Sequence, residues 1–518
     1  MNITWRLEER ADATPQAYAI LDDRTKRRCT YAGLRVRSAA LAHDFAGAGL
    51  APGDRVLIAV PMSLDLYVAL IGAWRCGLVA VVPDASMGRA ELDRCIKTAQ
   101  PAAVITAQRL AALAFALPAV RTIRRKFVFG WFPGMRSIKA PAPGLGAPAT
   151  IVTRDARDPA LITFTSGSTG VPKVAVRSHG VLDAQVKAIL ANVRLGTTTL
   201  ETMPIVLLAN LAAGGTSVIP NVNLRVVGKA DAGALATTIE QHGCKTLIGS
   251  PAVLQRLAEG CAEGDARLTC LEEVYSGGAP VFPAILEAFE RVAHHARTHA
   301  IYGSTEAEPI AHIAHREIAP HDVESMRQGH GLLVGLPDVS TEVVVIAAKW
   351  GQPLGPLSTE EFAARRVGPN AAGEIVVAGD HVLPGYLNGL GDEETKIHVD
   401  GRVFHRTGDI GRLDAGERLW LLGRASAALS DERGTLYPLA VECAASFIPG
   451  LRRSALVQSH GKRVLFIEGA GVSCADVRTR LAWAMIDEVV PTGTIPVDRR
   501  HNAKVDYPRL HLMASNRR

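Results

Sequence analysis

A loop rich in hydroxyl groups and glycines follows an apolar run at residues 161–173, LITFTSGSTGVPK. Glycines let backbone N–H groups converge on an anion, hydroxyl groups add donors, and the lysine adds positive charge. The loop is not a Walker loop, because Val171 and Pro172 separate Gly170 from Lys173. A flexible linker would not directly follow a strand pattern and end in Pro-Lys. The residue types therefore predict a triphosphate site made by Thr165, Ser166, Gly167, Ser168, Thr169, Gly170 and Lys173.

Further motifs follow the loop in a fixed order. They are GGAP at 277–280, YGSTE at 302–306, GEIVVAG at 373–379, GYLN at 385–388, RTGD at 406–409 and GR at 423–424. Each alone could be a plain turn or a surface charge. Together the motifs resemble the adenylate-forming superfamily of acyl-CoA ligases, luciferases and nonribosomal-peptide adenylation domains. The resemblance implies an enzyme that activates a carboxylic acid as an acyl adenylate, with ATP and magnesium as cofactors.

The resemblance also implies roles for individual residues. Glu306 is expected to be catalytic and to hold magnesium, which prefers hard oxygen ligands. Lys504, in IPVDRRHNAK, is expected to stabilise the charge that develops as the carboxylate attacks the α-phosphate. Asp409 offers acceptors to the ribose hydroxyls and Arg424 offers donors to the same nucleotide, although each charged residue taken singly could lie exposed on the surface. An adenine pocket, with the tyrosine stacked over the base, is implied for Gly277, Gly278, Ala279, Tyr302, Gly303, Ser304 and Thr305.

Within this superfamily, YGSTEAEPI, GTLYPLAVE and IPVDRRHNAK look most like the olefin β-lactone synthetases. That likeness implies a β-hydroxy fatty acid whose own hydroxyl attacks the acyl adenylate, closing a β-lactone with AMP as leaving group. Ser426 stands where the family has a hinge aspartate, which weakens the expectation of a thioester step. No base is assigned for ring closure, since His179, His405 and His501 are candidates by chemistry alone.

Two other functions stay open. One is an acyl-CoA or acyl-AMP ligase that passes a fatty or aryl acid to coenzyme A or to a carrier protein. The other is a non-catalytic nucleotide-binding scaffold that kept the fold. The second is less favoured, because a decayed site would be expected to have lost at least one of its four charged residues, Glu306, Asp409, Arg424 and Lys504.

The elements that must position these residues indicate a mixed α/β fold. Helix and strand patterns alternate up to about residue 310, and short strands and turns fill Val334 to Leu422. The superfamily resemblance implies an N-terminal AMP-binding adenylation domain of two stacked α/β layers and a β-rich subdomain, residues 1–423, and a small mobile α+β lid, residues 424–518. The apolar stretch from Leu66 to Pro83 carries Arg75 and predicts a buried helix running into a strand rather than a membrane span. Residues 201–220 are expected to form either an acyl pocket or a buried core helix.

Composition sets the class of protein. With 518 residues, 48% of them hydrophobic and 21% charged, the chain is predicted to be a soluble globular protein of two or more domains. Eight cysteines without a C-x-x-C spacing indicate core residues in a reducing compartment. Acidic residues near the start argue against a secretory signal, so a cytoplasmic location is expected. The expected partner is a small carboxylic acid substrate and no nucleic acid, with pathway enzymes as further candidates by analogy.

A basic segment interleaved with aromatic residues has two interpretations. It could contact an anionic membrane or another protein, or it could be a solvated face with snorkelling side chains. Most charge runs are solvated, so the second interpretation is favoured and peripheral membrane contact is not. The basic residues are Arg121, Arg124, Arg125, Lys126, Arg136 and Lys139, and the aromatic ones are Phe127, Phe129, Trp131 and Phe132.

Overall fold

The computed structural model describes residues 1–84, 87–138, 151–165, 173–347, 349–498 and 503–516. Their contacts divide the chain into two compact units. The first unit consists of Met1–Asn223, Ala234–Ile248 and Asp380–Asp392, and the second of Leu224–Gly233, Gly249–Gly379 and Glu393–Arg518.

The first unit contains a sheet whose pairings are all parallel except that of its last two strands. Parallel neighbours need crossover connections, which helices supply here. Helix α3 (Leu64–Arg75) packs on the strands at the centre, and α5 (Gln108–Phe115) packs further along the sheet. The strand order is β7 (Arg136–Ile138), β6 (Arg125–Phe129), β5 (Ala103–Ala107), β3 (Arg55–Ala59), β4 (Val79–Val82), β8 (Pro159–Thr165) and β9 (Lys173–Ser178).

Apolar side chains of this sheet form one core with two helices, α4 (Arg89–Ala99) and α6 (Pro118–Arg121). Val104, Ile162 and Phe164 from the strands pack with Ile96 of α4 and Val120 of α6. Burying both faces of parallel strands requires continuous runs of apolar residues, and VLIA and AVIT are such runs.

A second set of strands in the first unit is also mainly parallel, with one antiparallel pair at its end. Its order is β12 (Thr246–Gly249), β10 (Thr198–Glu201), β11 (Thr216–Ile219), β1 (Tyr18–Asp22) and β2 (Arg27–Thr30). The remaining long helices of this unit are α1 (Trp5–Ala13), α2 (Tyr31–Gly47), α7 (His179–Asn192), α8 (Pro204–Ala213) and α9 (Ala232–His242). Helix α8 packs against α1 and α7.

The predicted buried helix running into a strand is confirmed. Residues Leu64–Arg75 form α3, and β4 follows at Val79. The guanidinium of Arg75 has no exposed surface and pairs with Glu8, while its Nε donates to Ser38 Oγ at 3.1 Å. Because a buried charge needs a partner, this pair explains how an arginine lies inside an apolar helix. Among the described residues, no helix combines the length and apolar character needed to cross a membrane.

The second unit contains a mainly antiparallel sheet, in which only β13 and β14 of the described strands pair in parallel. The order is β17 (Glu342–Ile346), β18 (Gly373–Ala378), β20 (Arg402–Leu413), β21 (Leu419–Arg424), β16 (Leu332–Pro337), β15 (Ala307–Ala314), β14 (Arg297–Ser304) and β13 (Glu273–Ser276), with β19 (Lys396–Val399) beside β20. The predicted β-rich region is therefore confirmed. Its helices are α10 (Pro251–Gly260), α11 (Pro283–Val292), α12 (Pro320–Arg327), α13 (Thr359–Ala363) and α14 (Asp392–Thr395).

The C-terminal part of the second unit has a small sheet with its own core. Leu456, Leu465 and Val489 on its strands pack with Val441 and Val477 on two helices. An independent core agrees with a separate small domain, while the boundary at residues 423 and 424 and any lid rotation stay predictions. The elements are β22 (Leu429–Asp431), β23 (Gly434–Leu436), α15 (Pro438–Ala445), β24 (Leu451–Ser459), β25 (Lys462–Gly469), α16 (Cys474–Arg480), β26 (Glu488–Pro491) and α17 (Tyr507–Ser515).

Candidate active site

Two predicted nucleotide motifs lie at one edge of the second unit's sheet. GGAP follows β13 and YGSTE ends β14, and these two strands are parallel neighbours. A Cβ on Gly277 would lie 3.0 Å from the carbonyl oxygen of Ile301, and Gly278 has φ +80°. Both positions therefore favour glycine, for close approach and for the left-handed backbone. The carboxyl ends of parallel strands meet at the same edge, which is where α/β folds bind ligands.

Glu306 lies in the turn between two antiparallel strands. Ser304 at the end of β14 pairs with Ala307 at the start of β15, and the Glu306 N–H donates to Ser304 Oγ at 3.2 Å. The Glu306 side chain is partly exposed. This turn leaves the carboxylate accessible at the strand ends, next to the tyrosine of the same motif.

Tyr302, Asp409 and Arg424 form one hydrogen-bonded cluster. The Tyr302 hydroxyl donates to Asp409 Oδ2 at 2.7 Å, and Arg424 Nε lies 3.1 Å from Asp409 Oδ1. The register of β20 and β21 places Asp409 directly opposite Arg424. Arg424 Nη1 also donates to the carbonyl of Thr407 at 2.8 Å, which fixes the guanidinium. The YGSTE motif therefore meets the RTGD and GR motifs, which lie about 100 residues or more further along the sequence.

The charges of this cluster support one another. Burial, and then the Asp409 carboxylate, hold the pKa of Tyr302 well above its usual value, so the hydroxyl stays a donor at neutral pH. The Asp409 carboxylate is the first cause that raises the pKa of Arg424, and Glu306 adds to it. Asp409 Oδ2 accepts the hydrogen bond from Tyr302 and Oδ1 forms the ion pair with Arg424, and each oxygen keeps a lone pair for another donor. The carboxylate can thus accept ribose hydroxyls while the tyrosine and arginine hold it.

A buried ion pair supports the strand that carries Asp409. Arg406 and Glu374 have fully buried side chains, with Nη2 and Oε2 2.6 Å apart. The guanidinium also donates to the Gln352 carbonyl at 2.6 Å and lies 5.5 Å from the ring of Trp350. The pair bridges β18 and β20. Neither residue was predicted to have a role, although the two motifs GEIVVAG and RTGD carry opposite charges, which was a usable signal.

The phosphate loop connects two antiparallel strands of the first unit. Thr165 ends β8 and pairs with Lys173, which begins β9. Ser166, Gly167, Ser168, Thr169 and Gly170 lie outside the described residues, so their predicted role is not addressed by the structure.

Lys173 is buried, with 6% of its surface exposed. Its Nζ lies 5.4 Å from the ring centre of Tyr386. A Cβ on Gly391 would approach Lys173 Cε to 2.8 Å, so the glycine leaves room for the lysine stem. Tyr386 belongs to the GYLN motif, and sequence reasoning missed its contact with the lysine.

Lys504 lies in the loop between β26 and α17, and its backbone is held by one aspartate. The Lys504 N–H donates to Asp498 Oδ1 at 2.9 Å, and the Lys504 carbonyl accepts from the Asp498 N–H at 2.8 Å. Helix α17 begins three residues later, where the Tyr507 hydroxyl donates to Glu442 Oε1 at 2.6 Å. The loop is thus fixed on both sides of the lysine.

Ser426, in the predicted hinge, is exposed in a short 3-10 turn at Ala425–Ala427. The turn directly follows Gly423 and Arg424, and Gly423 has φ +147°. The position is compatible with a hinge, and the structure leaves the prediction untested.

Two of the three histidine candidates lie inside the fold. His179 has no exposed surface, and burial lowers its pKa to about 4, so the ring is neutral at pH 7. His405 is buried on β20 with Nδ1 3.2 Å from Lys396 Nζ. His501 lies outside the described residues. Burial gives His179 and His405 structural surroundings rather than those of an accessible base.

The apolar segment at 201–220 contains the core helix that was one of its two interpretations. Helix α8 buries Val206, Leu207 and Leu211 among others. Glu201, just before this helix, is fully buried, and burial raises its pKa well above the usual value. An acidic side chain whose neutral form is favoured by burial therefore lies inside the first unit.

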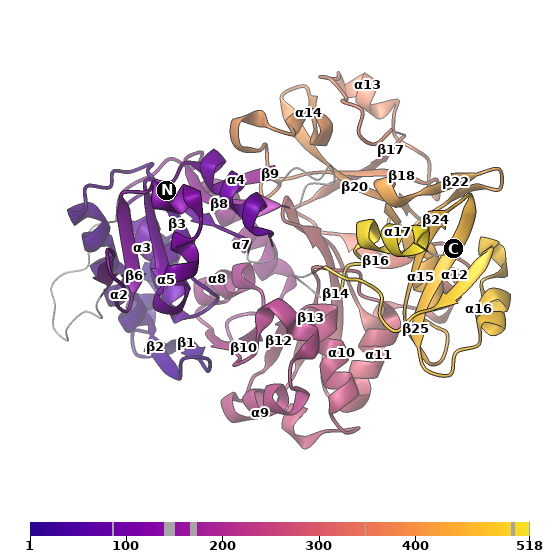
Figure 1. Ribbon diagram of the computed structural model, residues 1–518, viewed down its shortest axis with the longest axis horizontal. Coiled ribbons are helices and arrows are strands. Elements are labelled where there is room, and N and C mark those ends of the chain that lie inside the picture. The colour runs from indigo at the N-terminus through magenta and orange to yellow at the C-terminus, as the bar shows by residue number, and fades with distance from the viewer. Residues whose placement is uncertain (85–86, 139–150, 166–172, 348, 499–502, 517–518) are drawn as a thin grey trace. The chain divides into compact units, whose positions relative to one another are not determined.

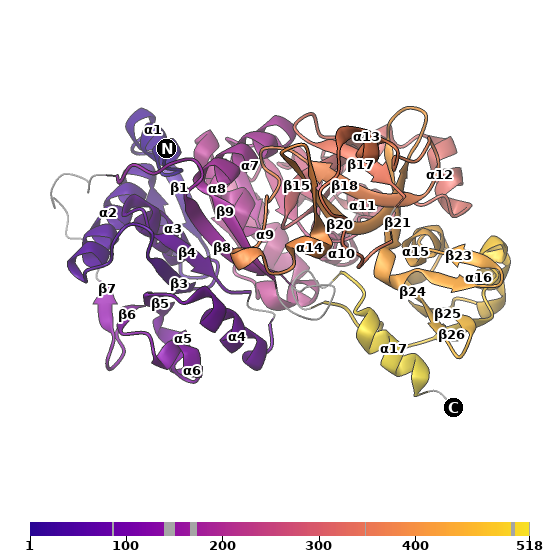
Figure 2. The same ribbon diagram turned by 90° about the horizontal axis from the view of Figure 1, so that it is seen from above.

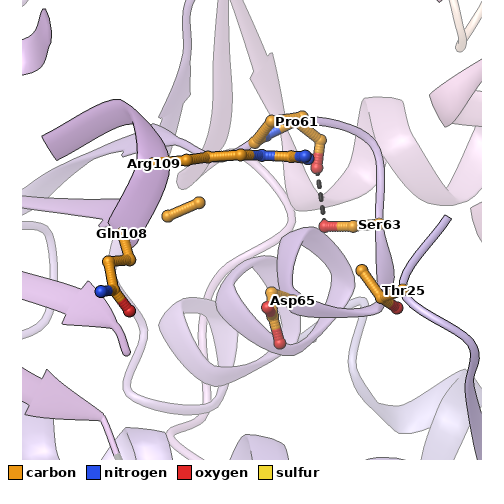
Figure 3. A pocket seen from close by; sticks show the side chains of 7 residues that line it. Thr25, Pro61, Ser63, Asp65, Gln108 and Arg109 are labelled. Carbon is orange, nitrogen blue, oxygen red and sulfur yellow. Dashed lines mark hydrogen bonds between the residues drawn. The ribbon is translucent and has the colours of Figure 1, made fainter. Parts of the chain in front are cut away.

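A separate open cavity of about 390 Å³ lies in the first unit, at the carboxyl ends of β3 and β5 (Figure 3). Thr25, Ser63, Asp65 and Arg109 contribute polar side chains to its wall. The Ser63 hydroxyl donates to the Pro61 carbonyl at 2.8 Å. None of the motif residues lines it, so this cavity is distinct from the predicted nucleotide site.

Comparisons with known proteins agree with this geometry. A family model described as AMP-binding enzyme matches residues 7–387. The chain is 31% identical over 513 residues to an olefin beta-lactone synthetase of Stenotrophomonas maltophilia, covering 94% of this chain and 91% of that protein. It is 28% identical over 463 residues to a feruloyl-CoA synthase of Amycolatopsis sp., covering 86% of this chain and 84% of that protein.

A solved structure, that of the amide bond synthetase McbA from Marinactinospora thermotolerans, matches with a TM-score of 0.83 at 21% identity and covers 99% of this chain and 100% of that chain. At this identity the match shows the fold, and it confirms the mixed α/β class. The family match and the full-length relative confirm the resemblance inferred from the motifs. The chain belongs to the AMP-binding enzyme family and is an acid-activating ligase of the adenylate-forming kind.

Proposed function

We propose that this protein joins a β-hydroxy fatty acid to AMP with ATP and closes the acyl adenylate to a β-lactone. The observation that carries the nucleotide part is the cluster of Tyr302, Asp409 and Arg424, with Asp409 2.7 Å from the tyrosine hydroxyl. The likeness to a beta-lactone synthetase along 94% of the chain supports the choice of product. Both supports are independent, since one is geometry and the other is sequence.

The residues proposed to bind the base and ribose of ATP are those of the GGAP, YGSTE and RTGD motifs, and those proposed to bind its phosphates are in the loop of 165–173. Gly277, Gly278 and Ala279 form the edge offered to adenine, and Asp409 accepts from the ribose. Gly303, Ser304 and Thr305 extend the same edge between the tyrosine and Glu306. The phosphate donors are those of the predicted loop, Thr165 to Gly170, together with Lys173.

Glu306 is proposed to hold magnesium together with the phosphates of ATP. The described residues contain no group of three or more His, Cys, Asp or Glu that could hold a metal without substrate. Magnesium in nucleotide enzymes takes one or two carboxylates and completes its shell with phosphate oxygens and water. When bound, the ion neutralises phosphate charge, and Glu306 fixes where that happens.

In the first step, a carboxylate oxygen of the acid attacks the α-phosphorus and pyrophosphate leaves. Lys504 is proposed as the cation that stabilises the negative charge gathering on the α-phosphate, and it acts most strongly where that charge develops. A lid formed by residues 424–518 is proposed to deliver it. The exposed turn at Ser426 is the proposed hinge.

In the second step, the β-hydroxyl oxygen attacks the acyl carbon, the bond to AMP breaks, and the hydroxyl proton is released. AMP leaves with the electron pair, so the lactone forms without coenzyme A. Because the attacking hydroxyl belongs to the same molecule and is held beside the activated carbonyl, the reaction needs no second substrate such as coenzyme A.

The second candidate is a ligase that transfers the acid to coenzyme A or a carrier protein. The feruloyl-CoA synthase relative, 28% identical over 86% of this chain, supports it. A scaffold without activity is not favoured, because Glu306, Asp409, Arg424 and Lys504 are all present.

The test is a mass-spectrometric endpoint assay with ATP, magnesium and fatty acids with and without a β-hydroxyl, in the absence of thiols. β-Lactone formed in equal amount to AMP is the expected result. Pyrophosphate exchange without lactone, followed by thioester once coenzyme A or a carrier is added, would support the ligase instead. Lys504→Ala is expected to abolish adenylation, with Lys462→Ala, an exposed lysine of β25, as the matched control. Full adenylation by Lys504→Ala would refute the role of that lysine.

A further inference from the structure

Residues 94–154 contain ten Lys and Arg residues and no Asp or Glu. In the described part of this segment beyond residue 108, Arg136 pairs with a carboxylate, Asp44, at 2.6 Å. Arg121 Nε and Arg125 Nε instead donate to backbone carbonyl oxygens, each at 2.8 Å. A carbonyl carries no net charge, so these bonds hold the arginine side chains in place without cancelling their charge. Arg154, at the end of the segment, pairs with Asp158 at 3.0 Å, so the positive charge of this surface comes from Arg109, Arg121, Arg124 and Arg125.

Large apolar side chains are exposed in the same region. Leu113 on α5 is 56% exposed, and Trp131 in the loop between β6 and β7 is 67% exposed. The loop is attached to the helix, because Phe132 stacks on Phe115 with ring centres 5.6 Å apart. The backbone N–H of Trp131 also donates to Gln108 Oε1 at 3.3 Å. The tryptophan is thus held beside α5.

The cations and these side chains share one region of the first unit. Arg109 and Leu113 are four residues apart on α5, so they lie on the same side of the helix. Arg109, Arg121 and Arg124 are exposed. Figure 2 shows α5, α6 and β6 together at one end of the sheet, and Figure 3 shows Arg109 at the start of α5. We call Arg109, Leu113, Arg121, Arg124 and Trp131 the basic face.

We propose that the basic face binds the surface of an anionic lipid bilayer. The proposal does not depend on the proposed reaction. A tryptophan and a leucine between arginines suit the headgroup region, where apolar parts enter and cations meet phosphates. The core of a protein interface is instead depleted in charged residues, whereas here cations and apolar side chains alternate. The sequence alone favoured a solvated face, and the exposure of Leu113 and Trp131 changes that balance.

Vesicle flotation of the full chain tests the proposal. The wild type is expected to float with vesicles that contain phosphatidylglycerol and not with phosphatidylcholine alone, and to be released by salt as screening shortens to about 3 Å at 1 M. Arg109→Gln with Arg124→Gln removes two charges but none of the carbonyl bonds. Each basic residue near an anionic surface contributes about fivefold, so the pair is expected to lower the partition coefficient about 25-fold. Trp131→Ser with Leu113→Ser keeps every charge and is expected to weaken binding to the anionic vesicles at low salt, where the wild type binds.

The matched controls are Arg28→Gln with Arg157→Gln, and Trp5→Ser, which replace exposed residues of the same unit outside the basic face. They are expected to float like the wild type. The charge and apolar variants are expected to keep the adenylation rate of the wild type, which shows that they fold. Absence of flotation with anionic vesicles, or equal loss in the controls, would overturn the proposal. Retention on polyglutamate without flotation would overturn it in favour of an acidic protein partner.

Discussion

Glu442 offers a pH-dependent test of how the loop carrying Lys504 is anchored. The Glu442 carboxyl is 5% exposed and accepts from the Tyr507 hydroxyl at 2.6 Å and from the Leu456 N–H at 3.2 Å. It therefore connects α15 to α17, the helix that directly follows the lysine loop. Burial raises its pKa to about 7. Glu442→Gln keeps the acceptor oxygen but cannot ionise.

The magnitude follows from the shift. Below the ordinary pKa of 4.5, the carboxyl is neutral in both the folded and the unfolded chain. As pH rises from there, the unfolded chain loses this proton first, so the free energy of unfolding falls until the folded carboxyl also ionises near pH 7. A shift of this size corresponds to about 3 kcal/mol, which Glu442 contributes at pH 4 and has lost at pH 8.

The glutamine variant reverses in sign across this range. At pH 4 the extra amide N–H group finds no acceptor, so the variant is expected to be less stable than the wild type by about 1 kcal/mol, and by pH 5 ionisation of the unfolded wild type has closed most of this gap. At pH 8 the wild type has lost the contribution of Glu442, and the variant is expected to be more stable by about 2 kcal/mol.

Hydrogen exchange of the β24 amides measures this effect. Comparing the variant with the wild type at the same pH cancels the intrinsic exchange rate, and the ratio of protection gives the difference in opening free energy. Glu432→Gln, which replaces an exposed glutamate of the same region, is the control for the substitution itself. If wild type and Glu442→Gln keep the same difference at pH 4 and pH 8, the carboxyl does not titrate in this range and the reasoning is wrong.

Three further changes test other parts of the fold. Tyr302→Phe removes the donor to Asp409 and is expected to raise KM for ATP about tenfold in pyrophosphate exchange, since a hydrogen bond to a charged group contributes about 1.5–3 kcal/mol; an unchanged KM would contradict the cluster. Arg406→Met leaves Glu374 buried without its partner and is expected to lower the free energy of urea unfolding by about 3–5 kcal/mol, and adding Glu374→Leu should recover most of it. Burial raises the pKa of Glu201, so the wild type is expected to lose thermal stability between pH 5 and pH 9, where the unfolded chain ionises this carboxyl more readily than the folded chain. Glu201→Gln cannot ionise and is expected to lack this loss; equal pH slopes of the two proteins would refute this.

The sequence could supply candidates for the nucleotide site because these residues occur in short local motifs, and their roles stay predictions. A hydroxyl- and glycine-rich loop, or an acidic residue after a strand pattern, carries its chemistry in adjacent positions. The buried helix at 64–75 was predicted for the same reason, since its apolar run is continuous along the chain. The β-rich region was predicted from its short strands and turns.

Contacts between distant segments could not be predicted in the same way. Glu374 and Arg406 belong to two separate motifs of the sequence. Only the register of β18 and β20 brings Arg406 Nη2 to 2.6 Å from Glu374 Oε2. The likewise unpredicted contact of Lys173 with Tyr386 joins segments over 200 residues apart. His179 and His405 were candidates by chemistry, but both are buried inside the fold. No local sequence pattern reveals the burial of a single polar residue.

The sequence by itself determined the family and the chemistry offered at each motif, because residue type and local order fix which groups can meet a phosphate, a ribose or a metal. Only the tertiary structure decided which of those groups share a site. Strand pairing placed Asp409 opposite Arg424 and within reach of Tyr302. Burial decided which charges are neutralised within the fold and which, as on the basic face, remain at the surface. Both depend on how distant segments pack, and packing is a property of the whole chain.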